Sequence, residues 1–195
     1  MRHIQQTAIR LFQEQGFDQV TVEQVAETAE VSPSSVYRYF RTKEGLVLHD
    51  EHDDQLLEVV IRELSQGTPI LTAFDRGIEA VAAQHFERDR EETLARTALW
   101  ATHRGIQAAA GAYLNELIER LVQAVVQGGR YEQAEAQFIV SALIHGVLAA
   151  IFAWYQDGAQ EPPEQYFEQG LAALASVFDA GGLTRPPDRS PSDPA

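Results

Sequence analysis

The chain has 195 residues, of which 45% are hydrophobic and none is cysteine, and its formal net charge at pH 7 is -14. This composition supports a folded core, either of one domain or of a small domain joined to a larger one, and it excludes disulfides and thiolate metal sites. We expect no secretory signal and no apolar run of about 18 residues, so the sequence predicts a cytoplasmic protein without a membrane span.

The negative charge is unevenly distributed along the chain. Residues 1–48 hold five Arg and Lys against six acidic residues, so most of the excess negative charge lies downstream. Arg38, Arg41 and Lys43, the single lysine of the chain, lie close together in this first part. Contact with phosphates requires a basic surface. The distribution therefore predicts that only the N-terminal end touches nucleic acid.

Two short helices are predicted at the start of the chain. Apolar residues recur at helical spacing from Ile4 to Phe12, and Gly16 follows where a C-cap residue would end the helix. Thr21 then offers an N-cap oxygen, with Gln24 three residues later as in a capping box. An apolar stripe behind Thr21 completes a second helix of barely two turns.

A third short helix is predicted after the turn that contains Glu30. Ser32 is its N-cap candidate, and Pro33 fits the first helical position, where a missing N–H costs nothing. We predict this helix over about residues 33–39. Two short helices with a tight turn between them, and with Arg and Lys beside the second, have the shape of a helix-turn-helix.

The rest of the chain is predicted to be helical up to about residue 179. Thr42 caps the next helix, and Gly or Pro residues mark the later turns. The predicted helices cover roughly 43–65, 70–87, 90–103, 107–127, 133–156 and 163–179. Residues 181–195 contain four prolines and little apolar surface, which predicts a disordered tail. The predicted fold is therefore all-α, with a head over 1–48 and a helical body over 49–180.

The head contains a set of paired positions at fixed spacing. The pairs are Leu11-Phe12, Gly16-Phe17, Thr21-Val22, Val25-Ala26, Val31-Ser32, Val36-Tyr37, Tyr39-Phe40 and Lys43-Glu44. On these positions, residues 4–48 resemble the DNA-binding head of the tetracycline-repressor (TetR) family. The resemblance covers about a quarter of the chain, and the later helices agree with that family only in number and length.

The resemblance implies that the third helix enters the major groove of double-stranded DNA. The implied DNA-binding residues are Thr21, Ser32, Pro33, Ser34, Ser35, Tyr37, Arg38, Tyr39 and Lys43. Thr21 and Lys43 would hold phosphates at helix N-termini, where free N–H groups and the dipole favour anions. In the alternative interpretations, Thr21 and Ser32 are caps alone, Tyr37 packs the third helix onto the first, and Arg38 is a plain solvated charge.

Three residues depart from the family pattern. Glu30 stands where members commonly have glycine, in a turn that needs positive φ, so we expect about 1 kcal/mol of strain there. Ser34 replaces another frequent glycine, and Tyr39 replaces a frequent histidine. These departures affect the expected base contacts and not the expected fold.

Two helices of the body carry a candidate homodimer interface. A stripe of small residues on the 133–156 helix allows another helix to approach closely, and the last helix offers apolar residues. The predicted interface residues are Ala142, Gly146, Ala149, Ala150, Ala153, Leu171, Leu174 and Phe178. In the alternative interpretation, the small stripe packs inside one subunit.

The other side of the same helix is predicted to line an apolar cavity with a few polar groups, which is the usual makeup of a small-molecule site. The predicted effector-binding residues are Thr97, Trp100, His103, Leu117, Phe138, Ser141 and His145. We expect an apolar or aromatic effector of unknown identity, anchored by His103, His145 or Ser141. In the alternative interpretation, the core is filled and binds no ligand.

Other patterns have weaker chemical meaning. The run from His49 to Asp54 places two histidines one turn apart beside carboxylates, but we interpret its acidic residues as the solvated side of an amphipathic helix. Paired acids such as Glu91 and Glu92 come with no pocket signature, so we predict no metal, no cofactor and no enzyme activity.

The sequence therefore predicts a homodimeric transcriptional regulator, more often a repressor than an activator, that a small molecule releases from a palindromic operator. Two alternatives stay open. One is an interaction module with a degraded head, and the other is a helical enzyme or carrier of apolar ligands without operator binding.

Overall fold

The computed structural model describes residues 1–49, 51–82, 86 and 88–180, and within these residues it contains helices and no strand. The helices are α1 (Arg2–Gln15), α2 (Val22–Thr28), α3 (Pro33–Phe40), α4 (Gly45–Leu48), α5 (Glu51–Ser65), α6 (Ile70–Ala82), α7 (Arg90–Thr102), α8 (Arg104–Gln127), α9 (Gln133–Gln156) and α10 (Pro163–Ala180). The predicted all-α fold is confirmed. The predicted disordered tail lies outside the described residues.

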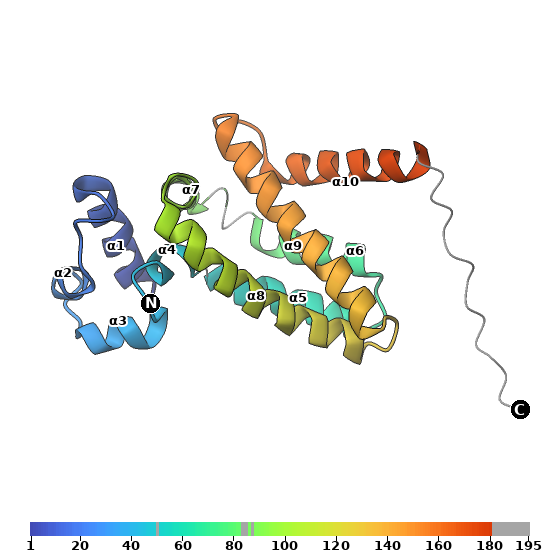
Figure 1. Ribbon diagram of the computed structural model, residues 1–195, viewed down its shortest axis with the longest axis horizontal. Coiled ribbons are helices and arrows are strands. Elements are labelled where there is room, and N and C mark those ends of the chain that lie inside the picture. The colour runs from blue at the N-terminus through green and yellow to red at the C-terminus, as the bar shows by residue number, and fades with distance from the viewer. Residues whose placement is uncertain (50, 83–85, 87, 181–195) are drawn as a thin grey trace, which may run out of the picture.

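The molecule is elongated, with α1, α2 and α3 gathered at one end (Figure 1). We call α1–α4 the head and α5–α10 the body. In the body, α5 packs against α6 and α8, and α9 packs against α7, α8 and α10. The α10 helix crosses the end of α9 and points away from the head (Figure 1). The head and the region around α10 are therefore at opposite ends of the subunit.

The head and the body share one hydrophobic core. Buried residues of α1–α4 pack in one cluster with Ala95 of α7 and with Ile106 and Ala110 of α8. A second cluster, centred on residues such as Phe74 and Leu121, joins α5, α6, α8 and α9. Because the first cluster includes body residues, the head is packed directly onto α7 and α8.

Local capping explains why the short helices of the head form. The Thr21 hydroxyl accepts a hydrogen bond from Gln24 N at 3.1 Å, and the Ser32 hydroxyl accepts one from Ser35 N at 3.2 Å. The predicted caps are therefore confirmed. The Gln24 amide donates to Gln15 Oε1 instead of returning to Thr21, so the expected capping box is not formed.

The turn between α2 and α3 has the predicted left-handed residue. Glu30 has φ 55°. Its N–H donates to Glu27 O, and Val31 N donates to Ala26 O at 2.9 Å. These two bonds form a Schellman motif, whose position after the C-cap favours glycine because a side chain is strained there. The sequence places a glutamate at this position.

The single helix predicted over 43–65 is wrong, because the chain divides at His49. α4 ends at Leu48, His49 is extended with ψ 127°, and α5 begins at Glu51. The Gln5 amide donates to Leu46 O at 3.1 Å and to His49 O at 2.5 Å. Gln5 thus satisfies carbonyl groups at the end of α4, which frees the chain to turn.

Two other predicted boundaries are compared with the structure. The helix predicted over 70–87 is described as α6 up to Ala82, and its predicted end cannot be compared, because residues 83–85 and 87 lie outside the described part of the chain. The helix predicted over 107–127 begins earlier, at Arg104, so only His103 separates α7 from α8. Gly105 lies inside the first turn of α8 and does not break it.

The expectation of no long apolar run is wrong for α9. Gln133–Gln156 has a window of mean hydropathy 2.0 and is long and apolar enough to cross a membrane by length and composition alone. One such helix is weak evidence for a span. Only 28% of that window is buried inside the subunit, so α9 leaves a large apolar surface uncovered by the described residues.

The left-handed turn gives a test of the head's stability. Glu30→Gly should leave the free energy of unfolding unchanged or raise it by up to about 1 kcal/mol, because glycine adopts this conformation without strain. The matched control is Glu27→Gly inside α2, which should lower the same free energy by about 1 kcal/mol. Urea denaturation of both variants measures the two effects. A clear loss of stability in Glu30→Gly would contradict the strain argument.

Candidate functional site

The α3 helix lies along one edge of the head (Figure 1), and most of its exposed residues are polar. Val36 and Phe40 are buried and fix α3 to the head, whereas Tyr37 is 46% exposed and Tyr39 is 42% exposed. The exposed residues of the outer face of α3 are Ser32, Pro33, Ser34, Tyr37, Arg38 and Tyr39. Most of the predicted DNA-binding residues therefore share one accessible surface.

The serines at the start of α3 form a compact hydroxyl cluster. Ser32 Oγ lies 2.8 Å from Ser34 Oγ and 2.9 Å from Ser35 Oγ. Ser32 also caps α3, and Ser35 is half-buried. These hydroxyls can donate or accept, so they can exchange their mutual bonds for bonds to base edges or phosphate oxygens.

The two tyrosines of α3 point outward with different partners. Tyr37 donates its hydroxyl hydrogen to Glu23 Oε1 at 3.4 Å. Its exposure contradicts the alternative in which it mainly packs α3 onto α1. The Arg38 guanidinium lies 4.8 Å from the centre of the Tyr39 ring and donates to the Tyr39 hydroxyl at 3.2 Å. Arg38 is thus held over the outer face of α3.

The three residues of the basic cluster, Arg38, Arg41 and Lys43, have different contacts in the structure. Arg38 lies on α3, while Arg41 pairs with Glu116 of α8 at 2.9 Å. Lys43 Nζ lies 4.4 Å from the centre of the Phe17 ring and 3.4 Å from Asp18 O. Lys43 comes two residues before α4 and is therefore not in a helix. Its contacts with Phe17 and Asp18 place it beside the α1–α2 turn. Arg41 therefore contacts the body, which the sequence alone did not indicate.

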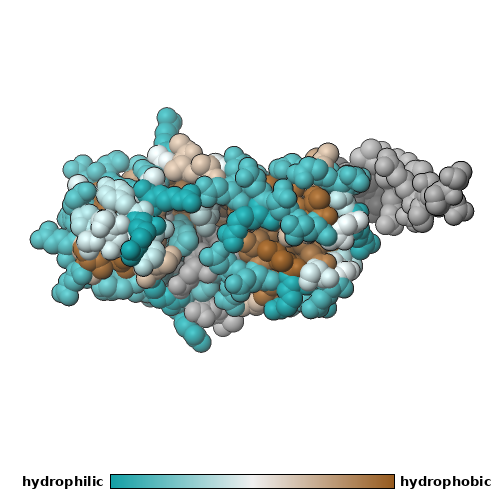
Figure 2. Space-filling model, turned by 90° about the horizontal axis from the view of Figure 1, so that it is seen from below, coloured by the Kyte–Doolittle hydropathy of each residue, from teal (hydrophilic) through white to brown (hydrophobic). Residues whose placement is uncertain are grey.

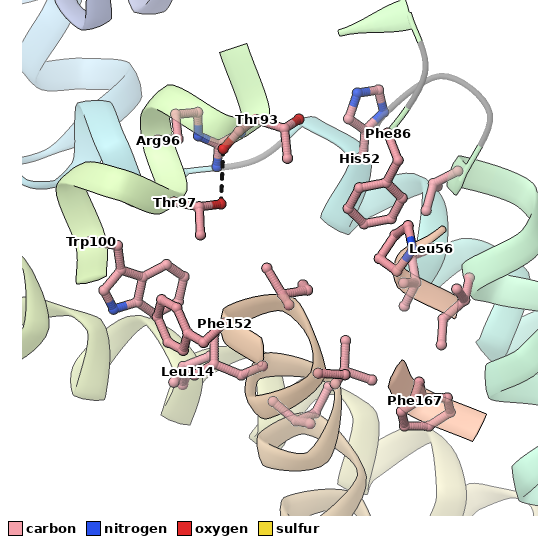
Figure 3. A pocket seen from close by; sticks show the side chains of 18 of the residues that line it. His52, Leu56, Phe86, Thr93, Arg96, Thr97, Trp100, Leu114, Phe152 and Phe167 are labelled. Atoms are coloured by element: carbon pink, nitrogen blue, oxygen red, sulfur yellow. Dashed lines mark hydrogen bonds between the residues drawn. The ribbon is translucent and has the colours of Figure 1, made fainter. Parts of the chain in front are cut away.

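A second candidate site is an apolar cavity of about 170 Å³ between the body and α4 (Figure 3). Its walls come from α4 to α10 and are mainly aliphatic and aromatic, with Leu56, Phe86, Trp100, Leu114, Phe152 and Phe167 among the lining residues. The Trp100 and Phe152 rings meet edge to face at 5.5 Å. The polar or charged lining residues are His52, Thr93, Arg96, Thr97 and Glu164.

The structure places only part of the predicted effector set in this cavity. Thr97, Trp100 and Leu117 line it. The predicted placement is wrong for His103, Phe138, Ser141 and His145, which lie outside it. Sequence reasoning missed His52, whose helix was not assigned to the cavity, and it missed Thr93 and Arg96 although their helix was assigned to it.

The helical register of α9 explains three of these errors. Phe138 is 74% exposed, and it shares an outward face with the exposed His145, which follows about two helical turns later. Ser141 is half-buried and accepts a hydrogen bond from the exposed Gln137. The cavity face of α9 instead carries Ile144, Val147, Leu148, Ile151 and Phe152.

His103 joins the head to the body. Its ring lies 4.5 Å from the Phe17 ring, and its Nε2 lies 3.1 Å from Asp18 Oδ1. Because His103 is the single residue between α7 and α8, these contacts fix the helix junction against the α1–α2 turn. Its role in the structure is therefore at the joint between head and body, and not at the cavity.

Only some of the predicted interface residues are exposed in the structure. Ala142, Gly146, Ala149 and Ala153 are exposed on α9, whereas Ala150 is buried and lines the cavity, so its predicted place is wrong. Leu171 is half-buried against the body core. The side chains of Leu174 and Phe178 lie outside the described residues. The remaining stripe is accessible, and the alternative of packing inside one subunit does not hold for it.

Within the run from His49 to Asp54, Asp54 is exposed whereas His52 lies on the buried side of α5. His52 is 8% exposed, lines the cavity, and lies 3.6 Å from Asp89 Oδ2. Asp89 also accepts from Arg2 of α1 at 2.7 Å. Asp50 and the side chains of Glu51 and Asp53 lie outside the described residues. Among the side chains that are described, no group of three or more His, Cys, Asp or Glu is placed to hold a metal.

The cavity and the head share α4. Val47 and Leu48 of α4 line the cavity, and Arg96 of α7 donates through Nε to Val47 O at 2.9 Å. On its other side, α4 is held by Gln5 of α1. A change in the cavity can therefore reach the head through one short helix.

Comparison with known proteins agrees with this architecture. Residues 4–49 match the family model of bacterial regulatory proteins, tetR family. The structure resembles FadR of Thermus thermophilus, a TetR family transcriptional repressor solved with lauroyl-CoA, with a TM-score of 0.55 and 21% identity over 100% of this chain and 99% of that chain.

Two further solved structures are similar. NalD of Pseudomonas aeruginosa, the secondary repressor of the MexAB-OprM multidrug efflux pump, has a TM-score of 0.55 and 20% identity over 90% of this chain and 93% of its own. The fatty acid degradation regulator FadR of Bacillus halodurans has a TM-score of 0.52 and 15% identity over 87% of this chain and 94% of its own. No curated protein matches the sequence. The structural likenesses extend the shared fold beyond the head to nearly the whole chain.

The link through α4 can be tested by removing the Gln5 amide. Gln5→Leu should lower the free energy of unfolding by about 2 kcal/mol, because it leaves buried carbonyl groups at the end of α4 without their donor. The matched control is its exposed neighbour, Gln6→Leu, which should change the free energy by less than about 0.5 kcal/mol. Equal effects of the two changes in urea denaturation would show that Gln5 does not hold α4.

Proposed function

Because the chain belongs to the tetR family of bacterial regulatory proteins through its N-terminal domain, we propose that it is a homodimeric, DNA-binding transcriptional repressor released by a small apolar molecule. The observation that carries the proposal is that α4 is packed into the head that bears α3 and also forms a wall of the cavity. We place the DNA-binding domain at 1–48 and the helical body at 49–180.

The surface of the head supports binding to duplex DNA. The outer face of α3 offers hydroxyl groups from Ser32, Ser34 and Tyr37, together with the Arg38 guanidinium, and such groups hydrogen-bond base edges and phosphates in a major groove. Arg38 and Lys43 are the cations of this region that we assign to phosphate, because Arg41 is paired with Glu116. We therefore assign α3 as the recognition helix, with Thr21 and Lys43 as phosphate contacts.

The uncovered face of α9 supports a homodimer. This face combines small residues, Ala142, Gly146, Ala149 and Ala153, with the 74% exposed Phe138. A contiguous apolar surface of this kind marks an interface, and small residues let two helices approach closely. Brown areas gathered over the body in Figure 2 show that apolar surface reaches the solvent there. We propose that α9 and α10 pair with their symmetry mates.

The cavity supports control by a small molecule in the cytoplasm. Its lining is mostly apolar with a few convergent polar groups, which suits a small ligand. The T. thermophilus relative was solved with lauroyl-CoA, so a similar fold accommodates a ligand with an apolar chain. Ligand binding lowers operator affinity only if the ligand prefers the subunit arrangement that fits DNA poorly.

A carrier of apolar ligands without operator binding is the second candidate, and the cavity alone is compatible with it. A selection from random duplex DNA separates the two functions. The repressor hypothesis predicts enrichment of palindromic sites with half-sites about one helical turn apart or more. A failure to enrich any sequence would favour the carrier or an interaction module.

The selected DNA gives a quantitative test of the phosphate contacts. With Arg38 and Lys43 from each subunit, the logarithm of affinity should fall against the logarithm of salt concentration with a slope of about -4. Lys43→Ala should bring that slope to about -2 and weaken all sequences alike. The control Arg130→Ala, in the α8–α9 turn, should leave the slope unchanged. If Lys43→Ala changes sequence preference and not the slope, Lys43 does not contact phosphate.

The interface can be tested by adding a charge to the uncovered face of α9. Ala149→Arg should convert the dimer to a monomer that no longer binds the selected DNA, because a buried unpaired charge is costly at an interface. The control Ala112→Arg makes the same change at an exposed position of α8 and should remain dimeric. Sedimentation equilibrium measures both. A dimeric Ala149→Arg with normal DNA affinity would place the interface elsewhere.

A further inference from the structure

Three of the polar residues that line the cavity come from a single helix, α7. Thr93, Arg96 and Thr97 share one face of α7, where they are three and four residues apart (Figure 3). Thr97 Oγ1 donates to the backbone carbonyl of Thr93 at 2.8 Å, and this bond fixes the Thr97 side chain. Phe167 of α10 lies on the other side of the cavity (Figure 3). A ligand therefore meets a group of polar side chains at α7 and mainly apolar walls elsewhere, with His52 of α5 and Glu164 of α10 as the charged or polar exceptions.

Arg96 gives the polar side its chemical character. A guanidinium is positively charged at any pH at which proteins fold, and its planar set of five N–H donors matches the two oxygens of a carboxylate. Because the aliphatic and aromatic walls solvate ions poorly, a carboxylate that enters the cavity gains most from a position beside this guanidinium. Neutral apolar ligands gain nothing from this group.

We propose that the effector is a compact apolar monocarboxylate whose carboxylate binds Arg96 while its apolar part fills the cavity toward Phe167. This inference rests on the proposed function and specifies the ligand of that same site. Glu164, which lines the cavity from α10 one turn before Phe167, repels a carboxylate at that side. The two charged residues thus set one orientation of the ligand.

The cavity volume limits the size of the ligand. An apolar cavity of about 150 Å³ accepts benzene. The present cavity of about 170 Å³ therefore suits a single aromatic ring or a chain of similar bulk. The aromatic residues Phe74, Trp100 and Phe152 in its wall favour either shape. Benzoate and hexanoate are suitable probes of this class.

The same guanidinium connects the ligand to the head. Arg96 Nε holds Val47 O of α4, and a carboxylate that draws the guanidinium toward the cavity weakens this bond. α4 is packed in one core with α1, α2 and α3. A bound carboxylate therefore shifts α4, and with it the spacing of the two recognition helices in the dimer.

The test compares ligands that differ only in the carboxylate. Isothermal titration calorimetry of the full-length chain at pH 7 with benzoate and benzyl alcohol, and with hexanoate and 1-hexanol, should show each carboxylate binding at least tenfold more tightly than its alcohol. Arg96→Gln should remove this preference while the alcohols keep their affinity within about twofold. Arg96→Lys, which keeps the charge without the planar donors, should retain part of it.

Arg130→Gln removes the same charge far from the cavity and should bind all four probes as the wild type does. Equal affinities of carboxylates and alcohols for the wild type would overturn the proposal, as would a preference that survives in Arg96→Gln. Absence of binding by all four probes would also overturn it. The comparison within the wild type decides the question even if Arg96→Gln does not fold. DNA selection without any ligand tests the proposed function separately, so the two failures are distinguishable.

Discussion

The hydrogen bonds from Gln5 to the end of α4 are the interaction on which the rest of the arrangement depends. A helix of one turn is not stable by itself, because nucleation fixes several residues for very few hydrogen bonds. α4 exists because Leu46, Val47 and Leu48 are buried and because Gln5 satisfies carbonyl groups at its end. The chain can then turn at His49 into α5. As a result, α4 is both the last helix of the head and a wall of the cavity.

The electrostatics of the chain fit a protein that touches DNA at one place. The net charge of -14 opposes nonspecific attraction to DNA, and only a few cations lie near α3. Arg41 forms a salt bridge with Glu116 of α8, which connects the head to the body. With a small phosphate contribution, hydrogen bonds from the hydroxyls of α3 to base edges would carry a larger share of operator affinity. Such binding is more specific and less dependent on salt.

Features governed by neighbouring residues were predictable from the sequence. The caps at Thr21 and Ser32 and the positive φ of Glu30 follow from local hydrogen bonding and backbone sterics, and the structure confirms all three. The break at His49 was not predictable, because the donor that permits it lies 44 residues earlier in the chain. Local sequence around 43–65 favours a continuous helix.

The candidate cavity was only partly predictable for a related reason. Almost every face of α9 carries apolar or small residues of its own, so the sequence pattern does not reveal which face is buried. Phe138 and His145 were placed inward on that basis, but packing against α8 and α10 turns them outward. Arg96 was overlooked because a charged residue on a helix is usually solvated. Only the approach of α4 to α7 shows that it belongs to the cavity wall.

The most direct test of the coupling through α4 is the operator affinity of a variant in which a protein side chain fills the cavity. Thr97→Phe places a ring beside Arg96 and α4, and Thr97→Val keeps the shape of threonine without its hydroxyl. With far-UV circular dichroism confirming that both variants are folded, the account predicts at least a tenfold loss of affinity for selected operator DNA in Thr97→Phe and little change in Thr97→Val. A folded Thr97→Phe that binds the operator as tightly as the wild type would contradict the coupling.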